Sequence, residues 1–432
     1  MLSYSYMKRL PDEKGAVFIL FGATGDLAIK KIFPALDTLQ KIASLKESSR
    51  IIAVSRRDWS DEDFRAHLVA SSTGISKNLI DRIEYLKVDI DRGTGFEDLA
   101  RATLIDGAEP VVYLSLAPRH HAEVSRALFD SKIITKGKGK LLIEKPFGTD
   151  EKTAKYLDKF LLEKIKDSQI YRVDHYLGKD TIRAIMDLHE STGDFDKLIS
   201  KESVESIHVR LFETKGIDGR GASYDGVGAF RDVGQNHMLE MLAVVAAELG
   251  KGKDEGKVWQ EARAKVFEHL APPAKTCDES RRAQYEGYGA EKGVSEGSQT
   301  ETAFEIRTTL ASGKLKGVPL VLESGKRMPS TEAFVEVVFK DISGIPKSMK
   351  FSVQPHQEIV IINRDGTSDA FEIPVVADAY TNVIRCALEG KEREFVGSRE
   401  IEALWAYADR VVDCRNKVPL EIYSEKKPFL IP

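Results

Sequence analysis

The hydrophobic pattern changes character near residue 179. Before that point, short continuous apolar runs alternate with amphipathic stretches of helical period, such as residues 30–45. Runs without polar alternation are typical of strands buried on both faces of a parallel sheet. Strands are expected at residues 16–22, 50–55, 84–90, 110–116, 140–146 and 169–175. Alternation of strand and helix predicts a doubly wound, Rossmann-like α/β domain over residues 1–178.

The second part of the chain has a different order of elements. Residues 205–213 alternate like a half-exposed strand, and further strand patterns follow one another without helices between them. These patterns occupy residues 301–310, 318–324, 333–341, 349–355 and 358–364, and helical patterns occupy 179–190, 235–250, 257–270, 379–390 and 399–414. We expect an α+β domain over residues 179–432, with a large, mostly antiparallel sheet. The Gly- and charge-rich residues 277–301 are expected to form a long surface loop.

Composition narrows the class of protein. The 432 residues are 42% hydrophobic and 31% charged, as in globular proteins, and the net charge of -4 argues against a nucleic-acid-binding protein. No apolar run is long enough to span a bilayer, and the polar N-terminus does not have the pattern of a secretory signal. Cys277, Cys386 and Cys414 are in no metal-type spacing, so idle thiols in a reducing compartment are expected. We therefore expect a cytoplasmic protein without membrane partners.

The stretch "FILFGATGDLAIKK" places Gly22 and Gly25 between the first strand and the first helix. Glycines here allow a tight turn and close approach of the backbone to a pyrophosphate, which the helix N-terminus also favours. Ala28 would permit close packing of the helix on the sheet. The second strand ends in "AVSRRDW", with Arg56 and Arg57 where NAD enzymes tend to carry an acidic residue. A cation there suits the 2'-phosphate of NADP, so we expect NADP as the cofactor.

Two polar clusters follow the fifth and sixth strands. Lys145, in "LLIEKPFGTD", stands at a strand's carboxyl end, where the nicotinamide and substrate should meet. In "RVDHYLGKD", His175, Tyr176 and Lys179 offer a set of donors and a cation that suits a phosphate group. His120 and His121 begin a helix after "LSLAP", close to the expected nucleotide site, and receive no role.

His237 is the candidate base. It stands at the start of an amphipathic helical pattern and follows Asp232 and Asn236. Oxidation of a sugar hydroxyl carbon requires loss of the hydroxyl proton, which a histidine with a pKa near ~6.5 can accept at neutral pH. A carboxylate would orient and steady the imidazole, and Asp174 is the candidate partner.

Taken together, these stretches resemble the glucose-6-phosphate dehydrogenase family. The matching segments are "FGATGDLA", "EKPFG", "RVDHYLGKD", "GRGASYDGVGAFRDVGQNH", "ETAFEIRTTLASGKLKGVPLVLESGKRM", "VQPHQEIVI" and "DAYTNVIRCALEGKEREFVGSREIEALWAYADRVV". They occur in family order over nearly the whole chain. The resemblance implies NADP-dependent oxidation of glucose 6-phosphate at carbon 1 to the lactone, without a metal, in a homodimer or homotetramer.

The resemblance also implies roles for individual residues. His237 is similar to the general base and Asp174 to its partner, while Glu213 and Asp232 resemble acceptors for sugar hydroxyls. The implied substrate-binding residues are His175, Tyr176, Lys179, Lys145, Glu213, Asp232, Lys326 and Lys31. The implied cofactor-binding residues are Gly22, Thr24, Gly25, Asp26, Leu27, Arg56 and Lys145.

The chain departs from the family pattern in places. Ile29 and Lys316 stand where a lysine and a tryptophan are usual, Thr331 stands near a usual basic position, and the second domain is short. Two other functions remain open on the sequence alone. One is a sugar oxidoreductase of the glucose-fructose oxidoreductase type, which would not need the "HYLGK" phosphate site. The other is a catalytically silent NADP-binding sensor.

Overall fold

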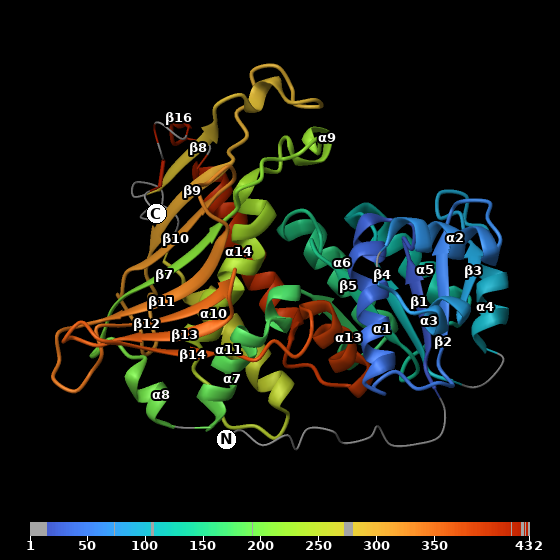
Figure 1. The fold of residues 1–432 in the computed structure, drawn as a ribbon, viewed down its shortest axis with the longest axis horizontal. Coiled ribbons are helices and arrows are strands. Elements are labelled where there is room, and N and C mark those ends of the chain that lie inside the picture. Colours follow the sequence, from blue (N-terminus) through green and yellow to red (C-terminus); the bar gives the residue numbers. More distant parts are fainter. Residues whose placement is uncertain are drawn as a thin grey trace. The chain divides into compact units, whose positions relative to one another are not determined.

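The computed structural model describes residues 15–72, 74–104, 108–191, 193–271, 280–415, 417–424, 427 and 429–430. It forms two compact units (Figure 1). Unit 1 comprises the chain up to His175 together with Ala377–Ser398, and unit 2 comprises Tyr176–Val376 with the chain from Arg399 onward. No helix within the described ranges combines the length and apolar character needed to cross a membrane.

Unit 1 is built on a seven-stranded sheet in the part of the chain that is described, with the order β15-β6-β5-β4-β1-β2-β3. The first six strands in sequence are parallel and fall where the apolar runs predicted them, which confirms the doubly wound fold. They are β1 Val17–Phe21, β2 Arg50–Ser55, β3 Ile83–Lys87, β4 Pro110–Leu114, β5 Lys140–Glu144 and β6 Ile170–Val173. The connecting helices are η1 Ala28–Ile32, α1 Phe33–Lys41, α2 Asp61–Ser71, α3 Lys77–Asp81, α4 Phe96–Leu104, η2 Pro118–His120, α5 His121–Asp130, α6 Glu151–Lys164 and η3 Asp167–Gln169.

Both faces of this sheet are buried, as continuous apolar strands require. Phe18 and Leu20 of β1 point into one core with residues of α1, α2 and α3, whereas Ile19 is buried on the opposite face. α2 and α6 begin with capping boxes at Ser60 and Asp150, whose side chains accept hydrogen bonds from the backbone of the first turn. These capping boxes fix where the helices begin after β2 and β5.

A late segment of the chain returns to unit 1. The sequence expectation assigned residues 179–432 to the second domain, but α13 Ala379–Glu389 packs on α1, and β15 Phe395–Val396 pairs antiparallel with β6. The ammonium of Lys140 donates to the backbone oxygens of Ala387 (2.7 Å) and Leu388 (3.0 Å) at the end of α13. A cation at a helix C-terminus satisfies carbonyls that lack intrahelical partners. These contacts explain why a helix distant in sequence belongs to the first unit.

Unit 2 is built on a large mixed sheet, in which nine strands of the described chain follow the order β14-β13-β12-β11-β7-β10-β9-β8-β16 (Figure 1). Most neighbours are antiparallel, as expected; β7 with β10 and β8 with β16 are parallel. The strands are β7 Val204–Phe212, β8 Arg281–Tyr285, β9 Ala303–Thr308, β10 Leu320–Gly325, β11 Glu332–Phe339, β12 Ser348–Gln354, β13 Glu358–Ile362, β14 Ser368–Glu372 and β16 Leu420–Tyr423. The helical elements are η4 His175–Gly178, α7 Asp180–Ser191, α8 Gly193–Leu198, α9 Gly221–Tyr224, η5 Phe230–Met238, α10 Leu239–Ala246, α11 Glu255–His269, η6 Tyr288–Ala290 and α14 Ser398–Arg415.

The helices of unit 2 cover a face of this sheet. α10 is buried along its whole length and packs on α7, α11, β7 and β11. η5, which carries His237, lies against β7 and β10. The alternating burial of β7 confirms the period-2 pattern of residues 205–213.

The prediction of one long loop over residues 277–301 is wrong, because Arg281–Tyr285 forms β8. The side chains of Arg282 and Gln284 in β8 are buried and donate to backbone oxygens. Arg282 donates to Val418 (2.8 Å), and Gln284 donates to Thr300 (2.9 Å). Buried polar groups that are hydrogen-bonded are tolerated, so a polar strand can lie inside a sheet.

The expectation of idle thiols is confirmed for Cys386 but is wrong for Cys414. Cys386 is a buried free thiol in α13, whereas Cys414 is disulfide-bonded. Cys277 lies outside the described residues.

The turn after β1 generates a test of the fold. Gly22 has a φ of 74°, and a Cβ there would lie 2.1 Å from the backbone oxygen of Ser115. Gly22→Ala should therefore lower the free energy of unfolding by roughly 2 kcal/mol or more, measured by urea denaturation. Gly93→Ala is the matched control, since Gly93 has a φ of 65° but a Cβ there would meet nothing within 4 Å. Equal losses in the two variants would mean that the approach of Ser115 is not a constraint.

Candidate functional site

A cavity of about 300 Å³ opens at the carboxyl ends of β1, β2, β3 and β4. Gly22 and Thr24 of the glycine turn line it, as does Arg56 from the end of β2. Gly25, Asp26 and Leu27 continue the same turn without lining the cavity. The position is that of the nucleotide site in doubly wound sheets, and the volume lies at the lower end of the range for small-molecule sites. Of the residues that the sequence predicts for cofactor binding, Gly22, Thr24 and Arg56 therefore lie at this cavity.

Local hydrogen bonds hold the loop that carries Arg56. The Tyr85 hydroxyl lies 2.8 Å from the Ser55 hydroxyl and donates to the backbone oxygen of Arg57 (2.7 Å). Arg57 itself turns away, with its guanidinium 4.7 Å from the centroid of the Trp59 ring. Arg56 is exposed beside the cavity, and none of the described residues forms a hydrogen bond or ion pair with its guanidinium. Of the two neighbouring arginines, only Arg56 is available to an anionic ligand in this cavity.

Ala28 lies where a small residue lets the first helix pack closely on the sheet. It is fully buried, and the backbone N–H of Ile29 donates to Gly25 (3.0 Å), so the helix starts directly after the second glycine. Lys31, which follows on η1, forms an ion pair with Asp378 (3.1 Å) from the returning segment. Both side chains are about half exposed, so water still reaches the pair.

A buried carboxyl group lies next to Lys145. Glu144, the last residue of β5, accepts a hydrogen bond from the Tyr113 hydroxyl, and its second oxygen accepts from the Lys145 backbone (3.2 Å). Burial raises the pKa of Glu144 to about 7; the Tyr113 hydrogen bond and Lys145 oppose this, and Asp174 adds to it. Sequence reasoning gave Glu144 no role, although its place beside Lys145 at a strand end was a usable signal.

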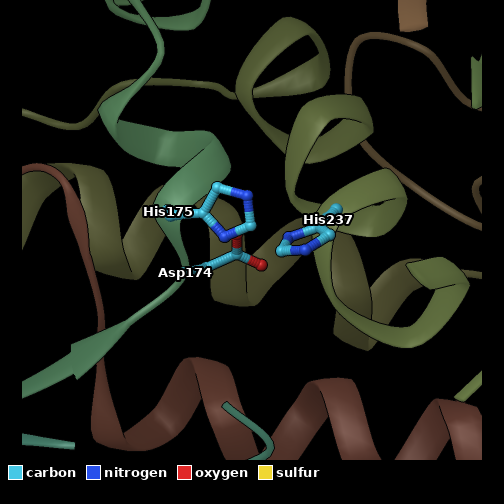
Figure 2. A group of neighbouring side chains, drawn as sticks. All are labelled: Asp174, His175 and His237. Carbon is cyan, nitrogen blue, oxygen red and sulfur yellow. The ribbon is translucent and has the colours of Figure 1, made fainter. Parts of the chain in front are cut away.

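Asp174 and His175 follow the end of β6 (Figure 2). Asp174 is buried, and the His175 ring stacks on Tyr380 of α13 with centroids 5.0 Å apart. Burial, followed by the nearby Glu144, Asp174 and Asp378 carboxyls, raises the pKa of Tyr380 far above its usual value. Tyr380 is a second residue that the sequence reasoning missed, because its helix was assigned to the other domain.

Tyr176 and Lys179 belong to unit 2. The chain turns through η4, where the Lys179 backbone donates to Tyr176 (3.0 Å), and the Lys179 ammonium lies 5.9 Å from the centre of the Tyr176 ring. His175, Tyr176 and Lys179 therefore lie on one short turn, and the boundary between the units falls within it.

His237 lies on η5, a π-helical segment (Figure 2). Its ring is buried and stacks on Tyr176, with centroids 4.2 Å apart and planes 26° apart. The Asn236 side chain donates to the backbone oxygens of Arg231 and Asp232 (3.1 Å each) and accepts from the His237 backbone (2.8 Å). These bonds satisfy backbone groups of the wide helical turn, a structure that is frequent at functional sites. The aromatic stack limits how the imidazole can rotate.

Three further predicted residues form an ionic cluster in unit 2. The Lys326 ammonium contacts Glu213 (2.5 Å) and Asp232 (3.0 Å). It also lies 5.3 Å from the centre of the Tyr224 ring, which sequence reasoning did not single out. Burial works to lower the pKa of Lys326, but Asp232 and Glu213 outweigh it and raise the pKa. Lys326 is thus charged at neutral pH and holds two carboxylates whose remaining oxygens can accept hydrogen bonds from hydroxyl groups.

Comparison with known proteins shows that both halves of the chain match domains of the same enzyme family. Residues 19–184 match the family model "Glucose-6-phosphate dehydrogenase, NAD binding domain", and residues 193–428 match the C-terminal domain of that enzyme. The chain is 30% identical over 418 residues to a glucose-6-phosphate 1-dehydrogenase of Helicobacter pylori strain J99, covering 94% of this chain and 95% of that protein.

Solved structures agree with these sequence matches. A glucose-6-phosphate dehydrogenase in complex with glucose 6-phosphate has a TM-score of 0.85 at 24% identity, with 96% of this chain and 95% of that chain covered. The enzyme from Mycobacterium avium has a TM-score of 0.83 at 26% identity, with 95% and 94% covered.

The buried Glu144 predicts a pH-dependent stability. Because its pKa is raised from 4.5 to about 7, the folded protein binds this proton more tightly than the unfolded chain does. The contribution of this proton to the stability of the folded state is complete below pH ~4.5 and is lost as the pH rises through about 7. The free energy of unfolding of the wild type, relative to Glu144→Gln, should therefore fall by roughly 2–3 kcal/mol between about pH 5 and pH 8.

Urea denaturation of both proteins across this pH range measures the difference. Glu163→Gln is the control, since Glu163 is exposed on α6 and should give a flat difference. A flat difference for Glu144→Gln as well would contradict the burial of a protonated carboxyl group.

Proposed function

The chain belongs to the glucose-6-phosphate dehydrogenase family, and on this premise we propose how its residues carry out the reaction. It oxidises D-glucose 6-phosphate at carbon 1 to 6-phospho-D-glucono-1,5-lactone, with NADP as the cofactor. This is the first step of the oxidative pentose phosphate pathway. A silent sensor and a glucose-fructose oxidoreductase are not favoured, because family models of this one enzyme match both halves of the chain.

The cofactor fits the residues of the cavity in unit 1. Gly22, Thr24 and the start of the first helix would hold its pyrophosphate, and Arg56 would meet the 2'-phosphate. When bound, NADP accepts a hydride from carbon 1 of the sugar. Lys145 would lie between the nicotinamide and the substrate, because it follows the neighbouring strand β5.

His237 acts in this proposal as the general base that takes the proton of the carbon-1 hydroxyl, and Asp174 holds the imidazole and steadies its charge. The observation that carries the pairing is the stack of Tyr176 on His237. Asp174 is two residues before Tyr176, and consecutive Cα atoms are about 3.8 Å apart. Chain connectivity therefore limits the distance between Asp174 and the residue that stacks on the base, which supports the proposed pairing.

The substrate's phosphate and hydroxyl groups would use the remaining residues. His175, Tyr176 and Lys179 lie on one turn and supply donors and positive charge for the phosphate. Glu213 and Asp232, held by Lys326, would accept hydrogen bonds from sugar hydroxyls. Lys31 stands on the first helical segment after the glycine turn and would add positive charge for the anionic substrate when it leaves Asp378.

The two sequence segments would then have distinct tasks. Residues 1–178 would bind the cofactor, and residues 179–432 would bind the sugar phosphate and associate into a homodimer or homotetramer. The sheet of unit 2 is the candidate for association, because β13 is half-exposed and β14 is exposed along its length. We place the enzyme in the cytoplasm, where its substrate and cofactor are available, and expect no nucleic-acid or membrane partner.

Reduction of nicotinamide by the purified protein tests the reaction. We expect absorbance to rise with glucose 6-phosphate and NADP, more slowly with NAD, and hardly at all with unphosphorylated glucose. Equal rates with glucose would rule out the phosphate role of the turn from His175 to Lys179. Binding of NADP without reduction by any sugar phosphate would favour the sensor.

Two histidine variants separate the proton step from substrate binding. His237→Asn should lower kcat by about 10²–10⁴-fold with little change in substrate affinity, because a general base is lost. His175→Asn should mainly raise KM for glucose 6-phosphate. Steady-state kinetics and substrate binding measured by calorimetry distinguish these effects. The reverse pattern would show that the base and the phosphate ligand have been exchanged.

A further inference from the structure

η2 contributes residues to the lining of the cavity at the ends of β1 and β2. This short turn follows β4 and brings Arg119 and His120 to the same cavity as Thr24 and Arg56. We infer that Arg119 is a second determinant of NADP selectivity, and that its guanidinium meets the 2'-phosphate together with that of Arg56. This inference rests on the NADP-dependent reaction described above.

The first argument is the hydrogen bonding of Arg119. Its Nε donates to Nε2 of His120 (3.1 Å), so that ring nitrogen acts as the acceptor. Nδ1 of His120 is 4.0 Å from Asp91 and 3.9 Å from Glu123. The His120 ring thus lies between the Arg119 guanidinium and this acidic pair. Within the described chain, Nε is the one Arg119 nitrogen with a protein partner, which leaves both Nη groups for a ligand.

The second argument is the charge of the cavity wall. Arg56 and Arg119 line it, but so do Asp89 and Asp91 from the segment after β3. Asp89 forms an ion pair with Arg92 (3.7 Å), whereas Asp91 lies 4.0 Å from Nδ1 of His120. Arg119 offsets the charge of Asp91, which would otherwise weaken the attraction of the 2'-phosphate to Arg56. Two guanidinium groups can instead each donate to the phosphate in a geometry that lysine does not reproduce.

The alternative for Arg119 is a stack of its guanidinium on the adenine ring. Such a contact would serve NAD and NADP equally, because both contain adenine. Ligands that differ only by the 2'-phosphate therefore separate the two roles. Arg119 is exposed, so its replacement should leave the fold intact.

The test is isothermal titration calorimetry of the full chain with 2',5'-ADP and with 5'-AMP. Arg119→Gln should weaken 2',5'-ADP binding by about 10- to 100-fold, as expected for a lost charge-assisted hydrogen bond, and change 5'-AMP binding by less than about 3-fold. Arg119→Lys should fall between the wild type and the glutamine variant. The ratio of kcat/KM for NADP to that for NAD should fall in parallel.

Arg57→Gln is the matched control. It removes a guanidinium from the same unit, but one that packs over Trp59 and does not line the cavity, so both affinities should stay within about 3-fold of wild type. Equal losses for 2',5'-ADP and 5'-AMP in Arg119→Gln would overturn the inference in favour of stacking. Unchanged binding of both ligands would overturn it outright.

The wild type distinguishes failure of this inference from failure of the cofactor assignment. If wild-type protein prefers 2',5'-ADP and Arg56→Gln abolishes the preference while Arg119→Gln does not, only the role of Arg119 is wrong. If wild-type protein binds 5'-AMP as tightly as 2',5'-ADP, selectivity for NADP itself is wrong.

Discussion

Parallel pairing of the strands in unit 1 brings the residues that follow each strand to one edge of the sheet. β1 pairs with β2 and β4, and β5 pairs with β4 and β6, all in the same direction. Gly22, Arg56, Lys145 and Asp174 stand at or just beyond the carboxyl ends of four of these strands. The change of direction in strand order between β1 and β4 leaves room for a ligand there, and the cavity occurs at that edge. The chemistry of this unit depends on that one topological constraint.

The returning segment adds groups that strand order alone does not supply. α13 stacks Tyr380 on His175, and its preceding residue Asp378 pairs with Lys31. Burial and the nearby carboxyl groups, Asp174 among them, favour the protonated forms of Glu144 and Tyr380. Because the pKa of Glu144 is about 7, the charge on this buried carboxyl group beside Lys145 changes near neutral pH.

Unit 2 handles its buried charges by direct pairing. Lys326 is almost fully buried yet remains charged, because two carboxylates contact it. Arg263 is likewise fully buried and contacts Glu240 and Glu400. An ion pair removed from water costs desolvation free energy and is tolerated when its geometry and hydrogen bonds compensate. In the Lys326 cluster this arrangement fixes two acceptor groups at defined positions, which suits recognition of a polyhydroxylated ligand.

The sequence by itself determined the six parallel strands, the glycine turn and the polar residues after β2, β5 and β6. These follow from local physics: continuous apolar runs, glycine where a Cβ would collide, and strand ends that carry function. It also identified the strands from β7 to β13 that have alternating or continuous apolar patterns. Local patterns could not reveal β8, because its Arg282 and Gln284 become compatible with burial only through backbone oxygens distant in sequence.

Only the tertiary structure decided that α13 belongs to unit 1, since its contacts with α1 and Lys140 span more than 200 residues of chain. The same long-range packing placed Tyr380 on His175, Glu144 against Tyr113, and Arg119 on the wall that Arg56 shares. These contacts have no local signature, because the property that matters in each case is a neighbour supplied by another element. The sequence alone indicated which residue types follow each strand. Tertiary packing determined which side chains are buried, which residues contact one another, and the resulting pKa shifts of Glu144 and Tyr380.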